Sequence, residues 1–275
     1  MKTVRILCLG DIVGAPGRAV FQKHIKHLKE KYAIDGVIVN GENSARGRGI
    51  TSRIVKFYRH NGVDVITTGN HIWHYREIYE YLNSHQDLLR PENYPSSCPG
   101  TGVTTFHCNG VTIGVLNLQG RVFMRDHVSC PFRAAESVLS YLKSKTNIII
   151  VDFHAEATSE KMGMGFFLDG KVSAVVGTHT HVQTTDNRIL PKGTAFMSDL
   201  GMAGALNSMI GMKKEPIIQN FLTQMPVKFT VEWQGPMVLS GAWIEIDADS
   251  GKAIKIERVR IVDEEIQIDG NEDTE

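Results

Sequence analysis

Short β-branched runs alternate with segments of helical periodicity along the first two-thirds of the chain, and no other property of the sequence restricts the fold as much. Residues 4–9 are expected to form a buried strand, and residues 17–31 the amphipathic helix that follows it. The same patterns predict further strands at 36–39, 63–67, 111–116, 148–153, 172–176 and 195–197, and helices at 52–60, 75–83 and 132–142. Repeated strand–loop–helix units predict a layered α/β fold.

The last quarter of the chain changes character. Residues 238–246 and 253–261 are expected to be antiparallel strands, joined by a turn with an Asp-Ser-Gly signal. Residues 200–228 carry Gly, Met and Pro with weak periodicity, which favours an insertion or lid over a core element. We find no linker, and therefore expect one domain over residues 1–266 and a frayed polar tail over 267–275.

Composition excludes several functional classes. Thirty basic residues balance thirty acidic ones, so no global field attracts nucleic acid or membrane, and local charge must attract any anionic substrate. The four cysteines lack CxxC spacing, which favours reduced thiols. There is no signal peptide and no apolar run of about 20 residues, so a cytoplasmic protein is expected.

Polar motifs follow five of the expected strands. In open α/β sheets, ligands bind beyond the carboxyl ends of the strands, where loops from several strands converge. The side chains in these motifs that can bind a metal are Asp11, Glu42, Asn43, Asn70, His154, His179 and His181.

The chemistry of these seven side chains indicates a catalytic metal centre. Oxygen and imidazole ligands without thiolate suit Fe, Mn or Zn. Seven ligands are too many for one catalytic ion and suit two, bridged by a carboxylate, which can clamp a phosphate during in-line displacement. With only two carboxylates, two divalent ions keep a net charge of +2, or +1 with a bridging hydroxide, and this surplus attracts a phosphate.

The motifs carry a family resemblance. Gly69-Asn70-His71 and the block from Gly177 to His181 resemble the GNH and GHxH blocks of the calcineurin-like metallophosphoesterases. The first strand lacks the usual DxH pair, and Asn40-Gly41-Glu42-Asn43 replaces GDxxD. With these departures, the motifs GDIVGxxGR, NGENxxxGxGI, DFHAEATSEK and GTHTHVQTxD are similar to those of the YmdB-type subfamily, from about residue 3 to about residue 262.

This resemblance implies an α/β/β/α sandwich with a dinuclear centre, Fe favoured and Mn²⁺ or Zn²⁺ as alternatives. It implies phosphodiesterase activity, with 2′,3′-cyclic nucleotides as family substrates. Carried over by motif, one metal is held by Asp11, Glu42, Asn43 and His181. The other is held by Glu42, Asn70, His154 and His179, so that Glu42 bridges the two.

His71 matches the proton donor of the family, and an imidazole suits proton transfer at neutral pH. The expected mechanism is direct hydrolysis by a hydroxide bridging the metals, while His71 protonates the departing ribose oxygen. A cyclic nucleotide or an RNA end is the expected substrate, and self-association is plausible. The alternatives are a phosphomonoesterase or protein phosphatase on the same centre, and a regulator that binds a nucleotide without turnover.

Some interpretations stay open at this point. Asp152, Thr178 and Thr180 are candidates to orient ligand imidazoles. Arg46 and Arg48 either contact a substrate phosphate or belong to a solvated loop. The methionines of the 200–228 segment belong to a lid, an oligomer contact or the core; they are Met202, Met209 and Met212.

Overall fold

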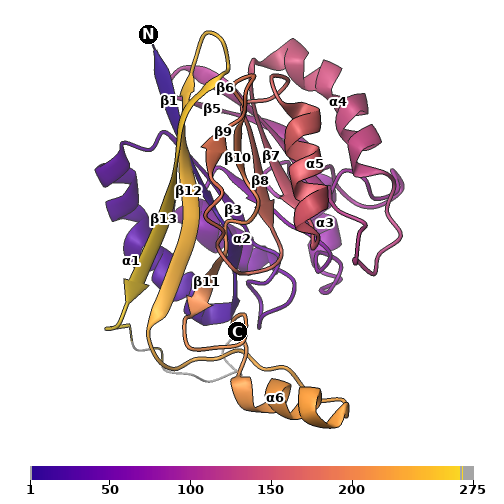
Figure 1. Ribbon diagram of the computed structural model, residues 1–275, viewed down its shortest axis with the longest axis vertical. Coiled ribbons are helices and arrows are strands. Elements are labelled where there is room, and N and C mark those ends of the chain that lie inside the picture. Colours follow the sequence, from indigo (N-terminus) through magenta and orange to yellow (C-terminus); the bar gives the residue numbers. More distant parts are fainter. Residues whose placement is uncertain (1, 267, 269–275) are drawn as a thin grey trace.

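Two β-sheets stack face to face between two layers of helices in the computed structural model, which describes residues 2–266 and 268 (Figure 1). The first sheet has the order β2-β11-β12-β1-β3-β4, with β13 paired to β12. Its strands are β1 (Thr3–Leu9), β2 (Asp11–Ile12), β3 (Gly36–Asn40), β4 (Val65–Thr67), β11 (Met202–Ala205), β12 (Met237–Asp247) and β13 (Ala253–Asp263).

The second sheet has the order β5-β6-β7-β8-β10-β9. Its strands are β5 (Val103–Cys108), β6 (Val111–Gln119), β7 (Ile148–His154), β8 (Ala174–Thr178), β9 (Arg188–Ile189) and β10 (Ala195–Met197). The helices are α1 (Gly14–Tyr32), α2 (Ser52–His60), α3 (Ile78–Ser84), α4 (Pro131–Lys145), α5 (Thr158–Leu168) and α6 (Lys214–Thr223).

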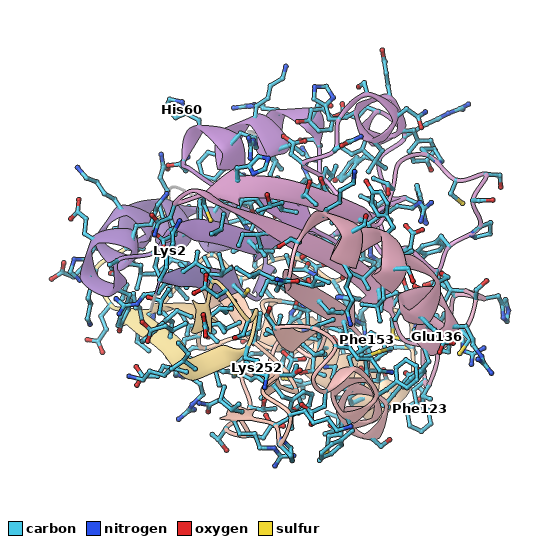
Figure 2. The ribbon with its side chains drawn as sticks, turned by 90° about the horizontal axis from the view of Figure 1, so that it is seen from above. Lys2, His60, Phe123, Glu136, Phe153 and Lys252 are labelled. Carbon is cyan, nitrogen blue, oxygen red and sulfur yellow. The ribbon has the colours of Figure 1, made fainter. Side chains whose placement is uncertain are left out.

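Alternating side chains fill separate layers of the core. In β1, Leu7 and Leu9 pack toward α1 and α2, whereas Ile6 and Cys8 pack between the two sheets. Phe153 of β7 packs with α4 and α5 on the far side of the second sheet. In the view from above, His60 at the end of α2 and Glu136 of α4 lie on opposite sides of the molecule (Figure 2). The predicted α/β/β/α sandwich is thus confirmed.

Parallel pairing sets the position of the loops that carry the motifs. β1, β3 and β4 are parallel neighbours, and so are β6, β7 and β8. Their carboxyl ends therefore point the same way within each sheet, and the loops that follow them gather at one edge.

Most predicted elements are confirmed, with one correction. α2 and β10 have the predicted bounds, and β12 and β13 form the predicted antiparallel pair. Within the predicted insertion at 200–228, however, β11 is a buried strand that joins β2 to β12, so this part is a core element. Met202 lies in that core with Val13 and Val238.

Three further expectations concern the cysteines, membrane-spanning segments and the C-terminal tail. All four cysteines are free, as predicted. No helix among the residues described combines the length and the apolar character needed to cross a bilayer. The predicted frayed tail falls at 267–275, of which the structure describes only residue 268.

Candidate metal centre

Five loop tips bring the predicted side chains together. They lie at the carboxyl ends of β1, β3, β4, β7 and β8, with Asp11 in the short β2 and His154 as the last residue of β7. Every predicted metal ligand has at least one other of them within hydrogen-bond or ion-pair distance. Asp11, Glu42, Asn43 and His154 are almost completely buried. The ends of β3, β7 and β8 bury the residues that they carry, because these three strands are buried along their whole length.

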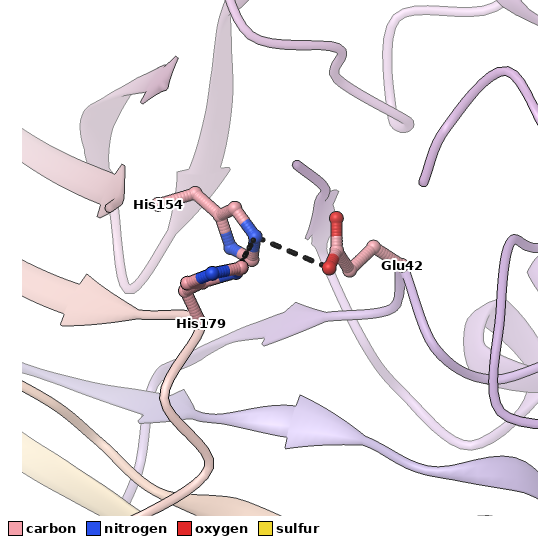
Figure 3. Close-up of side chains that lie close together, drawn as sticks. All are labelled: Glu42, His154 and His179. Atoms are coloured by element: carbon pink, nitrogen blue, oxygen red, sulfur yellow. Dashed lines mark hydrogen bonds and ion pairs between the residues drawn. The ribbon is translucent and has the colours of Figure 1, made fainter. Parts of the chain in front are cut away.

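His154 lies at the centre of one group of donor atoms (Figure 3). Its Nε2 is 3.1 Å from Glu42 Oε1, 3.1 Å from Asn70 Oδ1 and 3.0 Å from His179 Nδ1. One ring nitrogen carries at most one hydrogen, so it cannot satisfy three such neighbours by hydrogen bonding. The ligand atoms of Glu42, His154 and His179 all lie within 4.8 Å of one another, as in a metal-binding group.

A second group surrounds the amide of Asn43. Its Nδ2 is 3.2 Å from Asp11 Oδ1, 3.3 Å from Glu42 Oε1 and 3.0 Å from His181 Nε2. Asn43 Oδ1 faces His71 Nδ1 at 2.8 Å. Glu42 Oε1 belongs to both groups, because it lies 3.3 Å from Asn43 Nδ2 and 3.1 Å from His154 Nε2. It also lies 3.2 Å from His71 Nδ1.

Charge in this buried cluster shifts several ionisation equilibria. Burial would raise the pKa of Glu42, but the neighbouring His154 and His71 hold that pKa well below its usual value. Burial would lower the pKa of His154, yet the Glu42 carboxylate raises it to about 9. Burial and the repulsion from His154 lower the pKa of His179 to about 3. The low pKa of His179 keeps its imidazole neutral, which is the form in which histidine binds a metal.

A buried hydrogen-bond chain orients His154. Its Nδ1 lies 2.9 Å from Thr178 Oγ1, which donates to Asp152 Oδ1 at 2.7 Å. Since the Thr178 hydroxyl donates to Asp152, it accepts the Nδ1 hydrogen and leaves the Nε2 lone pair of His154 free for a cation. Asp152 also accepts from Thr67 Oγ1 and Asn40 Nδ2, and burial raises its pKa to about 6.

The loop that carries His179 and His181 holds an unusual backbone conformation. Both residues have positive φ, 107° and 64°. Non-glycine residues in such regions cost about 1–3 kcal/mol each and persist where their surroundings fix them. Asp11 Oδ2 accepts from His179 N, and Asp199 Oδ2 accepts from Thr180 N. His181 Nδ1 contacts the carbonyl of Ile210 at 2.8 Å.

Asp199 is held in turn by a buried lysine. Lys161 Nζ of α5 lies 2.7 Å from Asp199 Oδ2, and both side chains are 2% exposed. Replacing Lys161 with methionine leaves a buried carboxylate unpaired, so we expect the free energy of unfolding to fall by about 3–5 kcal/mol. Urea denaturation followed by circular dichroism measures this loss. Lys143→Met, at an exposed position of α4, is the matched control. If Lys161→Met lowered the free energy of unfolding by less than about 1 kcal/mol, the stabilising role of the Lys161–Asp199 ion pair would be contradicted.

The glycine of the Gly69-Asn70-His71 motif has a steric role. A Cβ atom at Gly69 would overlap the ring of His154 and the carboxylate of Glu42. We therefore expect Gly69→Ala to displace both proposed ligands and to reduce bound metal at least about tenfold. Mutating residues that only hydrogen-bond to metal ligands already lowers metal affinity or activity about 10–100-fold. Elemental analysis of the purified variant measures the loss. Gly163→Ala is a suitable control, because a Cβ there meets only ordinary contacts with Phe132; equal metal content in both variants would refute the steric argument.

Sequence reasoning missed several supporting residues. Lys161 and Asp199 are 38 residues apart, and no spacing signals their ion pair. Asn40 lies in the predicted Asn40-Gly41-Glu42-Asn43 motif, and its side-chain oxygen accepts a hydrogen bond from Glu42 N. Its position two residues before a predicted ligand could have indicated this supporting role. Thr178 orients an imidazole as considered above, whereas the Thr180 hydroxyl accepts from Val182 N and contacts no ligand imidazole within the described part of the chain.

Known proteins resemble this chain over nearly its full length. A family model described as YmdB-like protein matches residues 7–259. The 2′,3′-cyclic-nucleotide 2′-phosphodiesterase of Bacillus subtilis (strain 168) is 47% identical over 261 residues, which cover 95% of this chain and 98% of that protein. A solved structure of a hypothetical protein from Thermus thermophilus has a TM-score of 0.86 at 38% identity, covering 94% and 100% of the two chains. A novel phosphatase from Mycoplasma pneumoniae has a TM-score of 0.89 at 36% identity, covering 96% and 95%.

Proposed function

Because the chain belongs to the YmdB-like protein family, we propose that it is a metal-dependent phosphodiesterase that hydrolyses small cyclic nucleotides, with 2′,3′-cyclic nucleoside monophosphates favoured. The observation that carries this proposal is the convergence of oxygen and imidazole donors around Glu42. The 47% identity to a 2′,3′-cyclic-nucleotide 2′-phosphodiesterase supports the substrate class.

Donor spacing supports two metal ions. Cations with ligand distances of about 2.1 Å and octahedral angles keep neighbouring ligand atoms about 3.0 Å apart. The separations around His154 Nε2, 3.0 Å and 3.1 Å, fit such an arrangement of Glu42, Asn70, His154 and His179. When bound, the two cations would neutralise charge that develops on the phosphate and activate a water molecule as the nucleophile.

The second ligand set needs one amide rotation. Asn43 Nδ2 lies 3.0–3.3 Å from its three neighbours, and a 180° rotation of the amide places Oδ1 there instead. Asn43 then joins Asp11, Glu42 and His181 as an oxygen ligand. The rotation also turns Nδ2 toward His71 Nδ1, which becomes the acceptor of a hydrogen bond.

That tautomer suits His71 as the proton donor. With Nδ1 accepting from Asn43, the ring hydrogen resides on Nε2, for which the described residues offer no partner. The ring is one-quarter exposed, so Nε2 is accessible to a leaving oxygen. His71 would protonate that oxygen as the ribose–phosphate bond breaks. Fe is the favoured metal of this centre, and Mn²⁺ and Zn²⁺ remain compatible with the ligands.

Substrate assays with metal analysis test the proposal. Protein purified without oxygen is analysed for metal and assayed on 2′,3′-cyclic AMP, 3′,5′-cyclic AMP and p-nitrophenyl phosphate. We expect close to two metals per chain and the highest kcat/KM on 2′,3′-cyclic AMP. Preference for p-nitrophenyl phosphate would favour a phosphatase, the class of the similar Mycoplasma pneumoniae protein. Metal-loaded protein that binds cyclic nucleotide without releasing product would favour a regulator.

A further inference from the structure

A cavity of about 350 Å³ is lined in part by residues that follow the proposed metal ligands in the chain. Ala45 and Arg46, which follow the ligands Glu42 and Asn43, line one side. His74 lines another, and its backbone N–H donates to the His71 carbonyl at 3.0 Å. The third side is formed by residues 228–233. The cavity is thus built on the same loops that carry the metal ligands and the proton donor.

The third side is also linked to the metal centre. Ile210, whose carbonyl contacts His181, lies in the turn between Met209 and Met212. Met212 pairs with Val231, and Glu232 N donates to the Gly211 carbonyl at 2.9 Å. This pairing places residues 228–233 beside the turn that touches a proposed ligand.

A second cavity, of about 430 Å³, continues the first. The two share Ala45, Arg46 and Tyr75, so together they form one trough, and each exceeds the ~300 Å³ lower bound of typical ligand sites. The trough leads from the loop after Glu42 toward α2, whose residues Arg53, Ile54 and Phe57 line its far part.

The trough is basic although the chain as a whole is neutral. No acidic side chain is among the residues that line either cavity, whereas five basic ones are: Arg18, Arg46, Arg48, Arg53 and Lys228. Arg48, Arg53 and Lys228 make no ion pair within the described residues. With thirty basic and thirty acidic residues in the chain, this concentration is a local device for attracting anions.

Aromatic side chains stand among these cations. Phe229 is 52% exposed although it is large and apolar. Tyr75 lies where the two cavities meet, and Trp233 lines the first. The buried indole Nε1 of Trp233 has no hydrogen-bond partner in the described part of the chain. Rings that alternate with cations are the usual platform for single-stranded nucleic acid, because bases stack on the rings while the cations follow the backbone.

We propose that the trough binds the nucleotides that precede a 2′,3′-cyclic phosphate, so that the preferred substrate is a single-stranded oligoribonucleotide with that end. This inference rests on the proposed function, since it assigns the scissile phosphate to the metal centre. A cyclic mononucleotide has one phosphate, which would lie at the proposed metal centre and supply no anion to Arg48, Arg53 and Lys228 in the trough. An oligoribonucleotide supplies one further phosphate and one further base for each preceding residue.

Binding is tested first, without turnover. Fluorescence anisotropy measures the Kd of metal-loaded protein for a 5′-fluorescein-labelled hexa-adenylate that ends in a 3′-phosphate. We expect the double variant Arg48→Ser/Lys228→Ser to raise Kd about tenfold. The negative slope of log K against log salt should become shallower by about 1.4, or 0.7 for each lost contact. Phe229→Ala should raise Kd about fivefold or more. Arg76→Ser is the matched control, because Arg76 follows Tyr75 but lines neither cavity.

Kinetics then separate this inference from the proposed function. We expect kcat/KM to be at least about tenfold higher for hexa-adenylate with a 2′,3′-cyclic end than for 2′,3′-cyclic AMP. The double variant should lose that preference while changing less than about twofold on the mononucleotide. If the mononucleotide is hydrolysed as well as the oligonucleotide, or if a poly-glutamate peptide binds as tightly, the trough proposal is overturned and the phosphodiesterase stands. If neither substrate is hydrolysed but the variants weaken hexa-adenylate binding, the proposed function fails and the trough is supported.

Discussion

Glu42→Gln is expected to abolish the metal centre while the fold persists. Glutamine has nearly the same shape, so the core keeps its packing, but one buried negative charge is removed from between His154 and His71. Mutating a residue that only hydrogen-bonds to a metal ligand typically lowers metal affinity or activity about 10–100-fold. Because Glu42 Oε1 belongs to both proposed ligand groups, we expect activity to fall by about 10³-fold or more. Bound metal should drop below one ion per chain.

Metal content and turnover of this variant are measured together. Elemental analysis gives the number of ions, and hydrolysis of 2′,3′-cyclic AMP gives kcat/KM. Glu136→Gln is the matched control, because it makes the same chemical change at an exposed site of α4. A Glu42→Gln enzyme with two metals and full activity would rule out a bridging role for this carboxylate.

The sequence predicted the elements whose pattern is local. α2 was predicted with its observed bounds because Ile54, Val55 and Tyr58 repeat at helical spacing and are buried on one face. The strands that precede the ligands were found because they are short and fully buried, such as β3 and β7. Parallel pairing then brings their ends to one edge, which is why motifs far apart in sequence could be assigned to one site.

Elements that depend on distant partners were missed. β11 reads as Met-Ala-Gly-Ala, without β-branched residues, and it is a strand because β2 and β12 offer it pairing on both sides. α5 buries Lys161, and a charged residue on the buried face interrupts the apolar periodicity that would otherwise predict this helix. Only the folded chain provides Asp199 as its counter-ion, so neither the helix nor the support of the histidine loop could be read locally.

The arginines of the Gly-rich loop illustrate the same limit. From sequence alone, Arg46 and Arg48 fit a solvated loop as well as a substrate contact. The distinction depends on Lys228 and Phe229, about 180 residues later, which face the same cavity. A local pattern can therefore indicate a functional loop, while the distant residues that line the same cavity become visible only in the folded structure.

The role of His71 rests on its position beside the ligands. Its backbone N–H donates to Glu42 Oε2 at 3.1 Å, and its Nδ1 faces Asn43 Oδ1 at 2.8 Å. The first contact holds the backbone and the second holds the ring, and neither makes His71 one of the proposed ligands. A partly exposed imidazole beside the proposed metal centre is suited to protonate the leaving oxygen, a contribution that is typically worth about 10²–10⁴-fold in rate.

We therefore expect His71→Ala to lower kcat on 2′,3′-cyclic AMP by about 10²–10⁴-fold while metal content stays near that of the unmodified protein. Bis(p-nitrophenyl) phosphate sharpens the test, because nitrophenolate leaves without a proton, so the loss on this substrate should be below about tenfold. His60→Ala, at the exposed end of α2, is the control. An equal loss on both substrates would mean that His71 positions the site rather than donating a proton, because a structural defect does not distinguish between leaving groups.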